Sequence, residues 1–370
     1  MQKVCQLRSP AFLVDLATVK NNCKVMIEKC KSLGVQLRTN MKTHRTLQAG
    51  ELMTGGTKRC LSVSTLAEAE FYADGGFDDI TYAYPLSPDK VPQAAQLLSR
   101  LQNFHVLIDN HVVLDSMVAN QPPQGKRWSV FLKVNCGYNR AGVSYDDPKG
   151  LELAKEIASK ECLTFKGLYI HEGNAYNCAG EGKIKETTSE ALTKLQIILN
   201  RLQEAGIECP VVGIGSTPSC SKPPDDLLKG ITEFHPGNYV FYDYQQFLIG
   251  SCDISDIAVR VLTRVIGNYP DRGQILIDCG WTGLSLDSFG KLKTGYCFFE
   301  GHPNLKLVKM TQEIGIVEAA EGSLDVSLFP IGKLLKMIPY HACNTAYMHP
   351  VYYVVNGDSI VDKWIPNRGW

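Results

Sequence analysis

The sequence predicts an α/β fold, with an N-terminal (β/α)8 barrel of the TIM type followed by an all-β domain. Eight strand-like runs alternate with helix-like runs over about 230 residues, which is the size of a barrel of parallel strands joined by helical crossovers. No Gly-x-Gly-x-x-Gly segment follows the first strand, so an open, doubly wound dinucleotide-binding sheet has no support. After about Tyr244 the long helical periods disappear and short β-like runs follow one another.

The predicted barrel elements follow from hydrophobic periodicity and from glycines that end the helices. A short apolar segment, Ala11–Val14, precedes the first helix, and glycines such as Gly34 and Gly206 follow helical runs. The predicted strands begin at Gln36, Cys60, Asp79, Phe104, Trp128, Thr164, Pro210 and about Gly230. The predicted helices span residues 15–33, 46–53, 65–73, 88–101, 111–119, 148–159 and 184–205.

The C-terminal part reads as a separate β-domain, because Gly, Pro, Asn and Asp separate short alternating runs there. We expect the barrel domain to span residues 10–250 and the β-domain residues 251–370, with residues 1–9 as candidates to join the β-domain. The predicted β-like runs are 259–266, 274–278, 305–309, 315–318, 324–329 and 352–355.

Composition excludes several classes of partner. Lys+Arg and Asp+Glu are balanced at 38 each, so no basic field is available for nucleic acid or an anionic membrane surface. No apolar run has the length of a signal peptide or a membrane span. The 13 cysteines are odd in number and show no Cys-x-x-Cys pairing, which favours reduced thiols. We therefore expect a cytoplasmic protein without nucleic-acid or membrane partners.

Polar residues follow the predicted strands at the ends where barrel enzymes carry their chemistry. Lys42 follows the first strand, Arg140 follows the fifth, and the segment from Tyr169 to Tyr176 covers the end of the sixth. A lysine in this position is either a surface cation or the attachment point of a carbonyl cofactor, since an amine forms a Schiff base with an aldehyde. The neighbouring loops decide between these two interpretations.

Two glycine-containing loops suit a phosphate group. Gly-Ser-Thr-Pro, with Thr217, follows the seventh strand, and Pro-Gly-Asn, with Gly237 and Asn238, follows the eighth. Glycine allows backbone N–H groups to approach an anion, and hydroxyls add donors. A Gly-Ser-Thr-Pro segment on its own is more often an ordinary turn, but two such loops at adjacent strand ends indicate a phosphate site. A phosphate site across the barrel mouth from Lys42 predicts pyridoxal 5'-phosphate bound as a Schiff base to Lys42.

A metal site is predicted further along the chain. His341 and Cys343 are two residues apart, and on an extended segment their side chains point the same way. Imidazole and thiolate together suit Zn²⁺, with water and substrate as the remaining ligands of a catalytic site. The alternative is a core histidine beside a buried cysteine.

Taken together, these segments resemble the fold-type III pyridoxal phosphate enzymes, the group of alanine racemase and D-threonine aldolase, and most closely the eukaryotic D-serine dehydratases. The resemblance extends over nearly the whole chain. It rests on the order and spacing of Met-Lys42-Thr-His, Gly-Ser-Thr-Pro, His-Pro-Gly-Asn-Tyr, Asp278-Cys-Gly-Trp-Thr, Gln312-Glu-Ile-Gly and His341-Ala-Cys343.

The resemblance implies a role for each candidate residue, a D-amino acid substrate and a homodimer. His235 stands where alanine racemases carry an arginine beside the pyridine nitrogen, so that Tyr169 and His235 are both candidates for this position. Arg140 matches the family, whereas Asn135 stands where the family often has aspartate. The implied roles are Lys42 as Schiff-base lysine and catalytic base, Thr217, Gly237 and Asn238 as phosphate ligands, Tyr169 and Tyr176 as further cofactor contacts, and His341 and Cys343 as Zn²⁺ ligands.

The implied reaction is the dehydration of D-serine to pyruvate and ammonia, with D-threonine as a further substrate. Lys42 would take the Cα proton, and Zn²⁺ would assist departure of the β-hydroxyl. The alternatives are a metal-dependent D-3-hydroxyamino acid aldolase, a racemase, which needs a second base and no metal, and a non-catalytic pyridoxal phosphate carrier. Such carriers usually consist of the barrel alone.

Overall fold

The computed structural model of the protein describes residues 2–225 and 230–370. The chain forms two compact units. The β unit consists of residues 1–23 and 238–366, and the barrel unit consists of residues 24–237 and 367–370.

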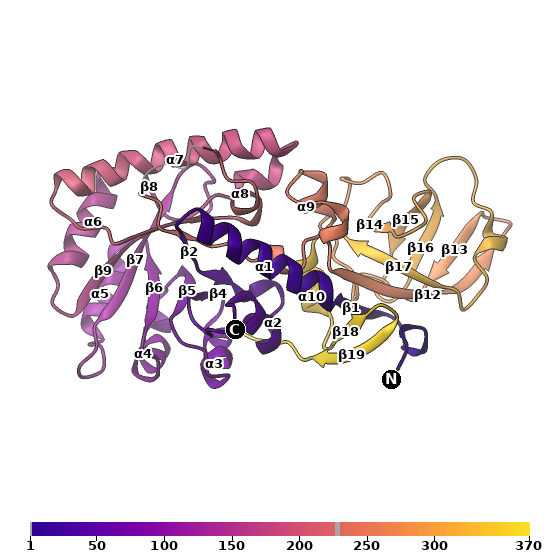
Figure 1. Ribbon diagram of the computed structural model, residues 1–370, viewed down its shortest axis with the longest axis horizontal. Helices are drawn as coiled ribbons and strands as arrows, with labels where there is room; N and C mark the ends of the chain where they lie inside the picture. The colour runs from indigo at the N-terminus through magenta and orange to yellow at the C-terminus, as the bar shows by residue number, and fades with distance from the viewer. Residues whose placement is uncertain (1, 226–229) are drawn as a thin grey trace. The chain divides into compact units, whose positions relative to one another are not determined.

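The barrel unit contains a nearly closed ring of parallel strands, with helices around the outside (Figure 1). Every strand pair in this sheet is parallel, and the short β8 (Val143–Ser144) adds to β7. The two ends of the sheet, β2 and β3, are separated in the chain by Arg38 alone, so the predicted first strand supplies both ends. The predicted barrel is confirmed. Its strand order is β2 (Gln36–Leu37), β11 (Glu233–Phe234), β10 (Val211–Gly215), β9 (Leu163–His171), β7 (Trp128–Asn135), β6 (Phe104–Ile108), β5 (Ile80–Pro85), β4 (Leu61–Val63) and β3 (Thr39–Asn40).

The barrel helices agree closely with their predicted positions. Side chains of Thr65, Asn110 and Asp147 accept hydrogen bonds from the first-turn N–H groups of α3, α5 and α6. Within the described ranges, no helix has the length and hydropathy needed to cross a membrane. The helices are α1 (Leu16–Ser32), α2 (Leu47–Met53), α3 (Leu66–Asp74), α4 (Val91–Arg100), α5 (His111–Ala119), α6 (Pro148–Ser159), α7 (Glu181–Glu204) and α8 (Thr217–Ser221).

The β unit contains one mostly antiparallel sheet, which confirms the predicted all-β character of this part. Only the pairing of β1 with β18 is parallel among its described strand pairs. β17 (Leu334–Pro339) pairs with β12, and β14 (Cys297–Phe299) pairs with β17. The main path runs through β15 (Leu305–Met310), β16 (Gly315–Ala319), β13 (Gln274–Ile277), β12 (Val259–Tyr269), β1 (Ala11–Asp15), β18 (Tyr352–Asn356) and β19 (Ser359–Trp364).

Several elements of the β unit differ from the prediction. The predicted β-like run at 324–329 is wrong: a 3-10 turn, η7 (Val326–Leu328), forms there because the Asp325 side chain accepts from the Ser327 N–H. The strands β14, β17 and β19 were not predicted. Ala11–Asp15, read as an apolar segment before the first helix, forms β1 between β12 and β18, where both faces of the strand are covered.

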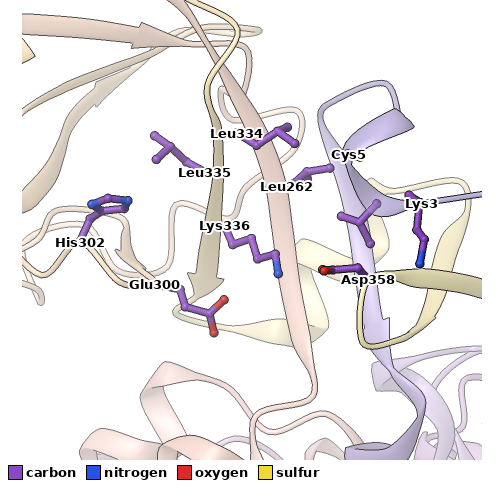
Figure 2. Close-up of a pocket in the computed structure, with 10 residues that line it drawn as sticks. Lys3, Cys5, Leu262, Glu300, His302, Leu334, Leu335, Lys336 and Asp358 are labelled. Carbon is purple, nitrogen blue, oxygen red and sulfur yellow. The ribbon is translucent and has the colours of Figure 1, made fainter. Parts of the chain in front are cut away.

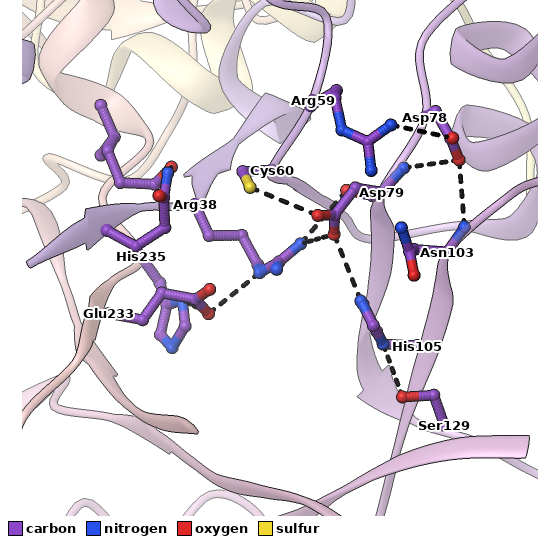
Figure 3. A network of polar contacts seen from close by, with 12 residues as sticks. Arg38, Arg59, Cys60, Asp78, Asp79, Asn103, His105, Ser129, Glu233 and His235 are labelled. Atoms are coloured by element: carbon purple, nitrogen blue, oxygen red, sulfur yellow. Dashed lines mark hydrogen bonds and ion pairs between the residues drawn. The ribbon is translucent and has the colours of Figure 1, made fainter. Parts of the chain in front are cut away.

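A buried network of charges lies where the barrel closes at Arg38 (Figure 3). The Arg38 guanidinium is 3% exposed and lies between two carboxylates, with Nε 2.9 Å from Glu233 Oε1 and a terminal nitrogen 2.6 Å from Asp79 Oδ1. Asp79 Oδ1 is also 3.2 Å from His105 Nε2, and His105 Nδ1 is 2.7 Å from Ser129 Oγ. The network therefore links the residue between β2 and β3 to β11, β6 and β7.

Replacing Arg38 by Met should be strongly destabilising, because it leaves Glu233 and Asp79 as buried carboxylates without their cation. We expect the free energy of unfolding to fall by about 3–5 kcal/mol. The matched control is Arg59→Met: Arg59 is 3.2 Å from Asp78, and its side chain is 40% exposed. This control should change the free energy by less than about 1 kcal/mol. Urea denaturation measures the free energy of unfolding of both variants. Equal losses of free energy in Arg38→Met and Arg59→Met would contradict the claim that the buried network stabilises the fold more than the exposed ion pair does.

The buried histidines should make the barrel less stable in acid. Burial lowers the pKa of His105 to about 4 and that of His44 to about 3, since each ring is held neutral inside the unit. Arg38 further lowers the pKa of His105, while the hydrogen bond to Asp79 raises it.

Below pH 6.5 the unfolded chain binds protons on these histidines and the folded chain does not, so stability is lost as the pH falls from 6.5 toward 4. For His105 the loss is on the order of 3 kcal/mol. Denaturation experiments between pH 7 and 4.5 should show that the free energy of unfolding declines less steeply with falling pH in His105→Gln than in the unaltered chain. An equally steep decline in His105→Gln and in the unaltered chain would refute the assignment.

Candidate functional site

Lys42 stands on a short, capped turn at the carboxyl end of the first barrel strand. The chain leaves β3 at Asn40 and enters the 3-10 turn η2 (Met41–Thr43), where Asn40 Oδ1 accepts from the Lys42 N–H at 3.0 Å. The Lys42 side chain is exposed. The guanidinium of Arg45 is paired with the buried Glu68 carboxylate at 2.6 Å. The local fold thus presents an accessible amine on a fixed backbone.

The two predicted phosphate loops meet beside this turn. The Gly237 N–H donates to Thr217 Oγ1 at 3.3 Å, which joins the loops after β10 and β11. A Cβ built on Gly237 would lie 2.8 Å from the Asn40 carbonyl oxygen, so the second loop packs against the segment leading to Lys42 at a point where only glycine fits. Hydroxyl and backbone N–H donors of this kind suit phosphate oxygens.

Tyr169 and His235 form a stacked pair inside the barrel. Tyr169, on β9, is 4% exposed, and its ring lies 3.9 Å from that of His235 at an angle of 13°. Burial, together with the charges of Arg38 and Lys133, holds the pKa of His235 well below its ordinary value, while burial raises the pKa of Tyr169. Both rings are therefore uncharged near neutral pH. The two side chains that are candidates for the position beside the pyridine nitrogen of the cofactor therefore lie against each other.

Positive charge gathers at the end of β9. His171, the last residue of that strand, is half-buried, and its pKa is held far below its ordinary value by burial and by the charges of Arg140, Lys133 and Lys42. Lys133 is itself buried on β7, and burial with the charge of Arg140 lowers its pKa to about 7. Lys42 and Arg140 follow the carboxyl ends of β3 and β7, and the predicted phosphate loops follow the carboxyl ends of other strands in the same parallel sheet, so this positive charge suits an anionic ligand.

Glu172 orders the loop that carries Tyr176, a role that the sequence did not reveal. Its carboxylate accepts from the N–H groups of Asn174 and Ala175 at 3.0 and 3.2 Å, and from Ser219 Oγ at 2.9 Å. These bonds link the turn η4 (Asn174–Asn177) to α8, which begins at Thr217. Tyr176 is half-buried in η4.

His341 and Cys343 lie at the start of a helix in the β unit, so the predicted extended segment is wrong. His341 immediately precedes α10 (Ala342–Met348), and Cys343 lies in the first turn. The helix forms because the Asp243 carboxylate accepts from the Ala342 N–H at 2.9 Å. The His341 imidazole and the Cys343 sulfur nevertheless share a hydrogen bond, so the two predicted ligands are brought together.

The surroundings of His341 favour a cation. Burial alone would lower its pKa, but the charge of Cys343 and hydrogen bonds to Asp287 and Cys343 raise the pKa to about 10. His341 Nδ1 is 2.5 Å from Asp287 Oδ2, which leaves the other ring nitrogen available for a second partner. Imidazole and thiolate, with a carboxylate behind the imidazole, form a donor set that fits Zn²⁺. In residues 2–225 and 230–370, no group of three or more His, Cys, Asp or Glu side chains is arranged to hold a metal ion.

Asn238 belongs to the same cluster. It is 5% exposed, and its Nδ2 donates to Asp243 Oδ2 at 2.7 Å and lies 3.5 Å from Cys343 Sγ. Its Oδ1 is buried without a hydrogen-bond partner among the described residues. The side-chain amide is thus engaged in the β unit, and the group that Asn238 can offer a phosphate is its backbone N–H.

A separate hollow of about 410 Å³ lies in the β unit (Figure 2). It is bounded by the N-terminal turn η1 (Val4–Gln6), the strands β12 and β17, and the β18–β19 turn, and none of the predicted site residues lines it. Its lining is Lys3, Val4, Cys5, Leu262, Glu300, His302, Leu334, Leu335, Lys336 and Asp358.

Comparisons with known proteins agree with this geometry. The model of the alanine racemase N-terminal domain matches residues 14–245, and that of the serine dehydratase domain matches residues 258–355. The D-serine dehydratase of Dictyostelium discoideum is 36% identical to this chain over 98% of both proteins. The chain belongs to the D-serine dehydratase family. The D-serine dehydratase of Saccharomyces cerevisiae is 30% identical and aligns with the whole chain and 98% of its own length. Membership in this dehydratase family makes the protein a lyase.

The solved structure of D-threo-3-hydroxyaspartate dehydratase from Delftia sp. HT23 superimposes with a TM-score of 0.94, at 30% identity and with full coverage of both chains. Further structures of that enzyme have either a histidine or a cysteine two positions later replaced by alanine, and the cysteine variant is described as metal-free. The same spacing separates His341 from Cys343 here.

Proposed function

We propose that this member of the D-serine dehydratase family eliminates water from D-serine, and from D-threonine, with pyridoxal 5'-phosphate and Zn²⁺ as cofactors. The enamine that is released then takes up one water to give a 2-oxo acid and ammonia. One observation carries the proposal: the imidazole of His341, backed by Asp287, shares a hydrogen bond with the Cys343 sulfur. This donor pair occurs in a chain that is 36% identical to a D-serine dehydratase over nearly its whole length.

Residues of the barrel unit fit pyridoxal phosphate. Lys42 would carry its aldehyde as a Schiff base. Thr217, Gly237 and the backbone of Asn238 would hold its phosphate, and Tyr169 and Tyr176 would provide further contacts. When bound, this cofactor supplies an electron sink for the bonds at the α-carbon of an amino acid. The joined phosphate loops, and the packing of Gly237 against the segment leading to Lys42, support these assignments.

The amine of Lys42 would act as the base that removes the Cα proton. Lys42 is accessible, and its backbone is fixed by the Asn40 cap. A base on a single face of the substrate accepts the proton of only one enantiomer, which accounts for a preference for D-amino acids.

His341 and Cys343 would hold Zn²⁺. The ion supplies a Lewis acid for the β-hydroxyl, which is otherwise a poor leaving group. Asp287 would keep the imidazole in the required orientation. The description of one Delftia structure as a metal-free form supports metal binding by that relative, in which a histidine and a cysteine have the same spacing.

The proposal extends to organisation and location. The barrel unit would bind pyridoxal phosphate, and the β unit would carry the metal. In the group that the chain resembles, the β-domain of one subunit usually completes the site of another, so we propose a cytoplasmic homodimer.

Product analysis with D-threonine tests the reaction type. Dehydration yields 2-oxobutanoate and ammonia, whereas aldol cleavage of the Cα–Cβ bond yields glycine and acetaldehyde. We expect 2-oxobutanoate as the main product, measured by chromatography after incubation with the zinc-loaded enzyme. Glycine as the main product would replace the proposed dehydratase by an aldolase.

A further inference from the structure

His341 and Cys343 are each held by a second layer of polar side chains in the β unit. A metal ion bound by only two side chains depends strongly on their orientation, because few other protein contacts fix its position. The residues behind these two ligands therefore bear on metal binding itself.

The first arm of this layer runs through Asp287. Its Oδ2 lies 2.5 Å from His341 Nδ1 and accepts from Asn344 Nδ2 at 2.6 Å. The Asp287 N–H donates to Ser285 Oγ at 3.1 Å, and the Ser285 N–H donates to Thr345 Oγ1 at 3.2 Å. Asp287 is thus bonded directly to Asn344 of α10, the helix that His341 precedes. A second, indirect connection to this helix runs through Ser285 and Thr345. Asp287 fixes the orientation of the His341 ring through Nδ1 and leaves the other ring nitrogen available for the metal.

The second arm runs through Asp243 and Asn238. Asp243 is fully buried and accepts three hydrogen bonds, from Ala342 N–H at 2.9 Å, Gln246 N–H at 3.0 Å and Asn238 Nδ2 at 2.7 Å. The same Asn238 nitrogen lies 3.5 Å from Cys343 Sγ. An amide that donates to a cysteine sulfur restricts the directions in which that sulfur can face, and a partner of this kind orients a metal ligand.

We propose that Asp287 and Asn238 are positioning residues for the metal ion. Asp287 orients the His341 imidazole, and Asn238, anchored by Asp243, orients the Cys343 sulfur. The inference rests on the proposed function, because it takes His341 and Cys343 as the metal ligands. The inference goes beyond that function because it assigns roles to two residues that do not contact the metal. Of these, Asn238 was predicted from the sequence only as a phosphate contact.

The test measures metal binding in the cofactor-loaded enzyme. Asp287→Ala and Asn238→Ala are prepared with Co²⁺ in place of Zn²⁺, since cobalt bound to thiolate gives a charge-transfer absorption. Competition with a metal-binding dye gives the affinity. We expect each variant to bind metal about 10- to 100-fold more weakly. Asn238→Ala should in addition shift the charge-transfer band, because the sulfur loses a hydrogen bond. In Asp287→Ala the visible absorbance of the bound pyridoxal phosphate should stay unchanged.

The control is Asp325→Ala in the same unit, which removes the cap of η7 and should leave metal affinity unchanged. Thermal melting of the metal-free proteins separates a folding defect from weaker binding. If Asp287→Ala does not fold, Asp287→Asn retains a hydrogen-bond acceptor for Nδ1, and we expect a smaller loss of affinity. If Asn238→Ala does not fold, Asn238→Ser retains a donor and should likewise lose less.

Two outcomes are distinguishable. If His341→Ala abolishes cobalt binding but the Asp287 and Asn238 variants bind within twofold of the unaltered enzyme, the positioning roles are wrong while the metal site stands. If His341→Ala binds cobalt normally, the proposed metal site itself is wrong, and so are the positioning roles of Asp287 and Asn238.

Discussion

Lys42→Ala is expected to abolish both the visible absorbance of bound pyridoxal phosphate and the dehydration of D-serine. The absorbance depends on the Schiff base that an amine at this position forms, and the same amine is the proposed base for the Cα proton. We expect turnover to fall at least on the order of 10²–10⁴-fold. Absorption spectra of purified protein and pyruvate formation from D-serine provide the two measurements.

The matched control is Lys133→Met. Lys133 is the other amine of the cationic cluster around His171, and its pKa is lowered to about 7, so it is the strongest competitor for the aldehyde. The absorbance should persist in Lys133→Met. An unchanged spectrum in Lys42→Ala, together with loss of the absorbance in Lys133→Met, would move the attachment point to Lys133.

Removal of the metal should stop D-serine dehydration without releasing pyridoxal phosphate. Neither His341 nor Cys343 is among the predicted cofactor residues Lys42, Tyr169, Tyr176, Thr217, Gly237 and Asn238, and Asn238 would contact the phosphate through its backbone N–H while its side chain lies 3.5 Å from the Cys343 sulfur. Treatment with a chelator should therefore lower turnover on the order of 10²-fold or more while the visible absorbance remains. Added Zn²⁺ should restore activity in the unaltered enzyme and fail to do so in Cys343→Ala. Full activity after exhaustive chelation would remove His341 and Cys343 from the reaction.

The barrel could be predicted because its local signals agree with the fold. Buried parallel strands read as short apolar runs, and helices with one apolar face end at glycines. The break of the first strand at Arg38 could not be predicted, since it depends on ion pairs with Asp79 and Glu233, which are remote in sequence. The strands β14, β17 and β19 were missed because β14 has only three residues, β17 ends in a proline and β19 carries the charged residues Asp362 and Lys363, features that weaken the signal of a strand.

The site residues in the loops that follow the barrel strands could be predicted, because their order along the chain gives their place in the barrel. Site residues whose positions depend on contacts with distant segments could not. Thr217 and Gly237 were found from the loops they occupy, and the structure joins them by a hydrogen bond. The helical start after His341 was missed because its cap, Asp243, lies far away in the sequence. Asp287 carries no motif of its own, and only the fold brings it to His341.

The most direct test of the proposed function is product analysis with D-serine. The enzyme loaded with pyridoxal phosphate and Zn²⁺ should release pyruvate and ammonia in equal amounts from D-serine, and none from L-serine. The same preparation of His341→Ala should release neither while retaining its visible absorbance. Glycine and formaldehyde in place of pyruvate, or undiminished pyruvate from His341→Ala, would contradict the proposed metal-assisted dehydration.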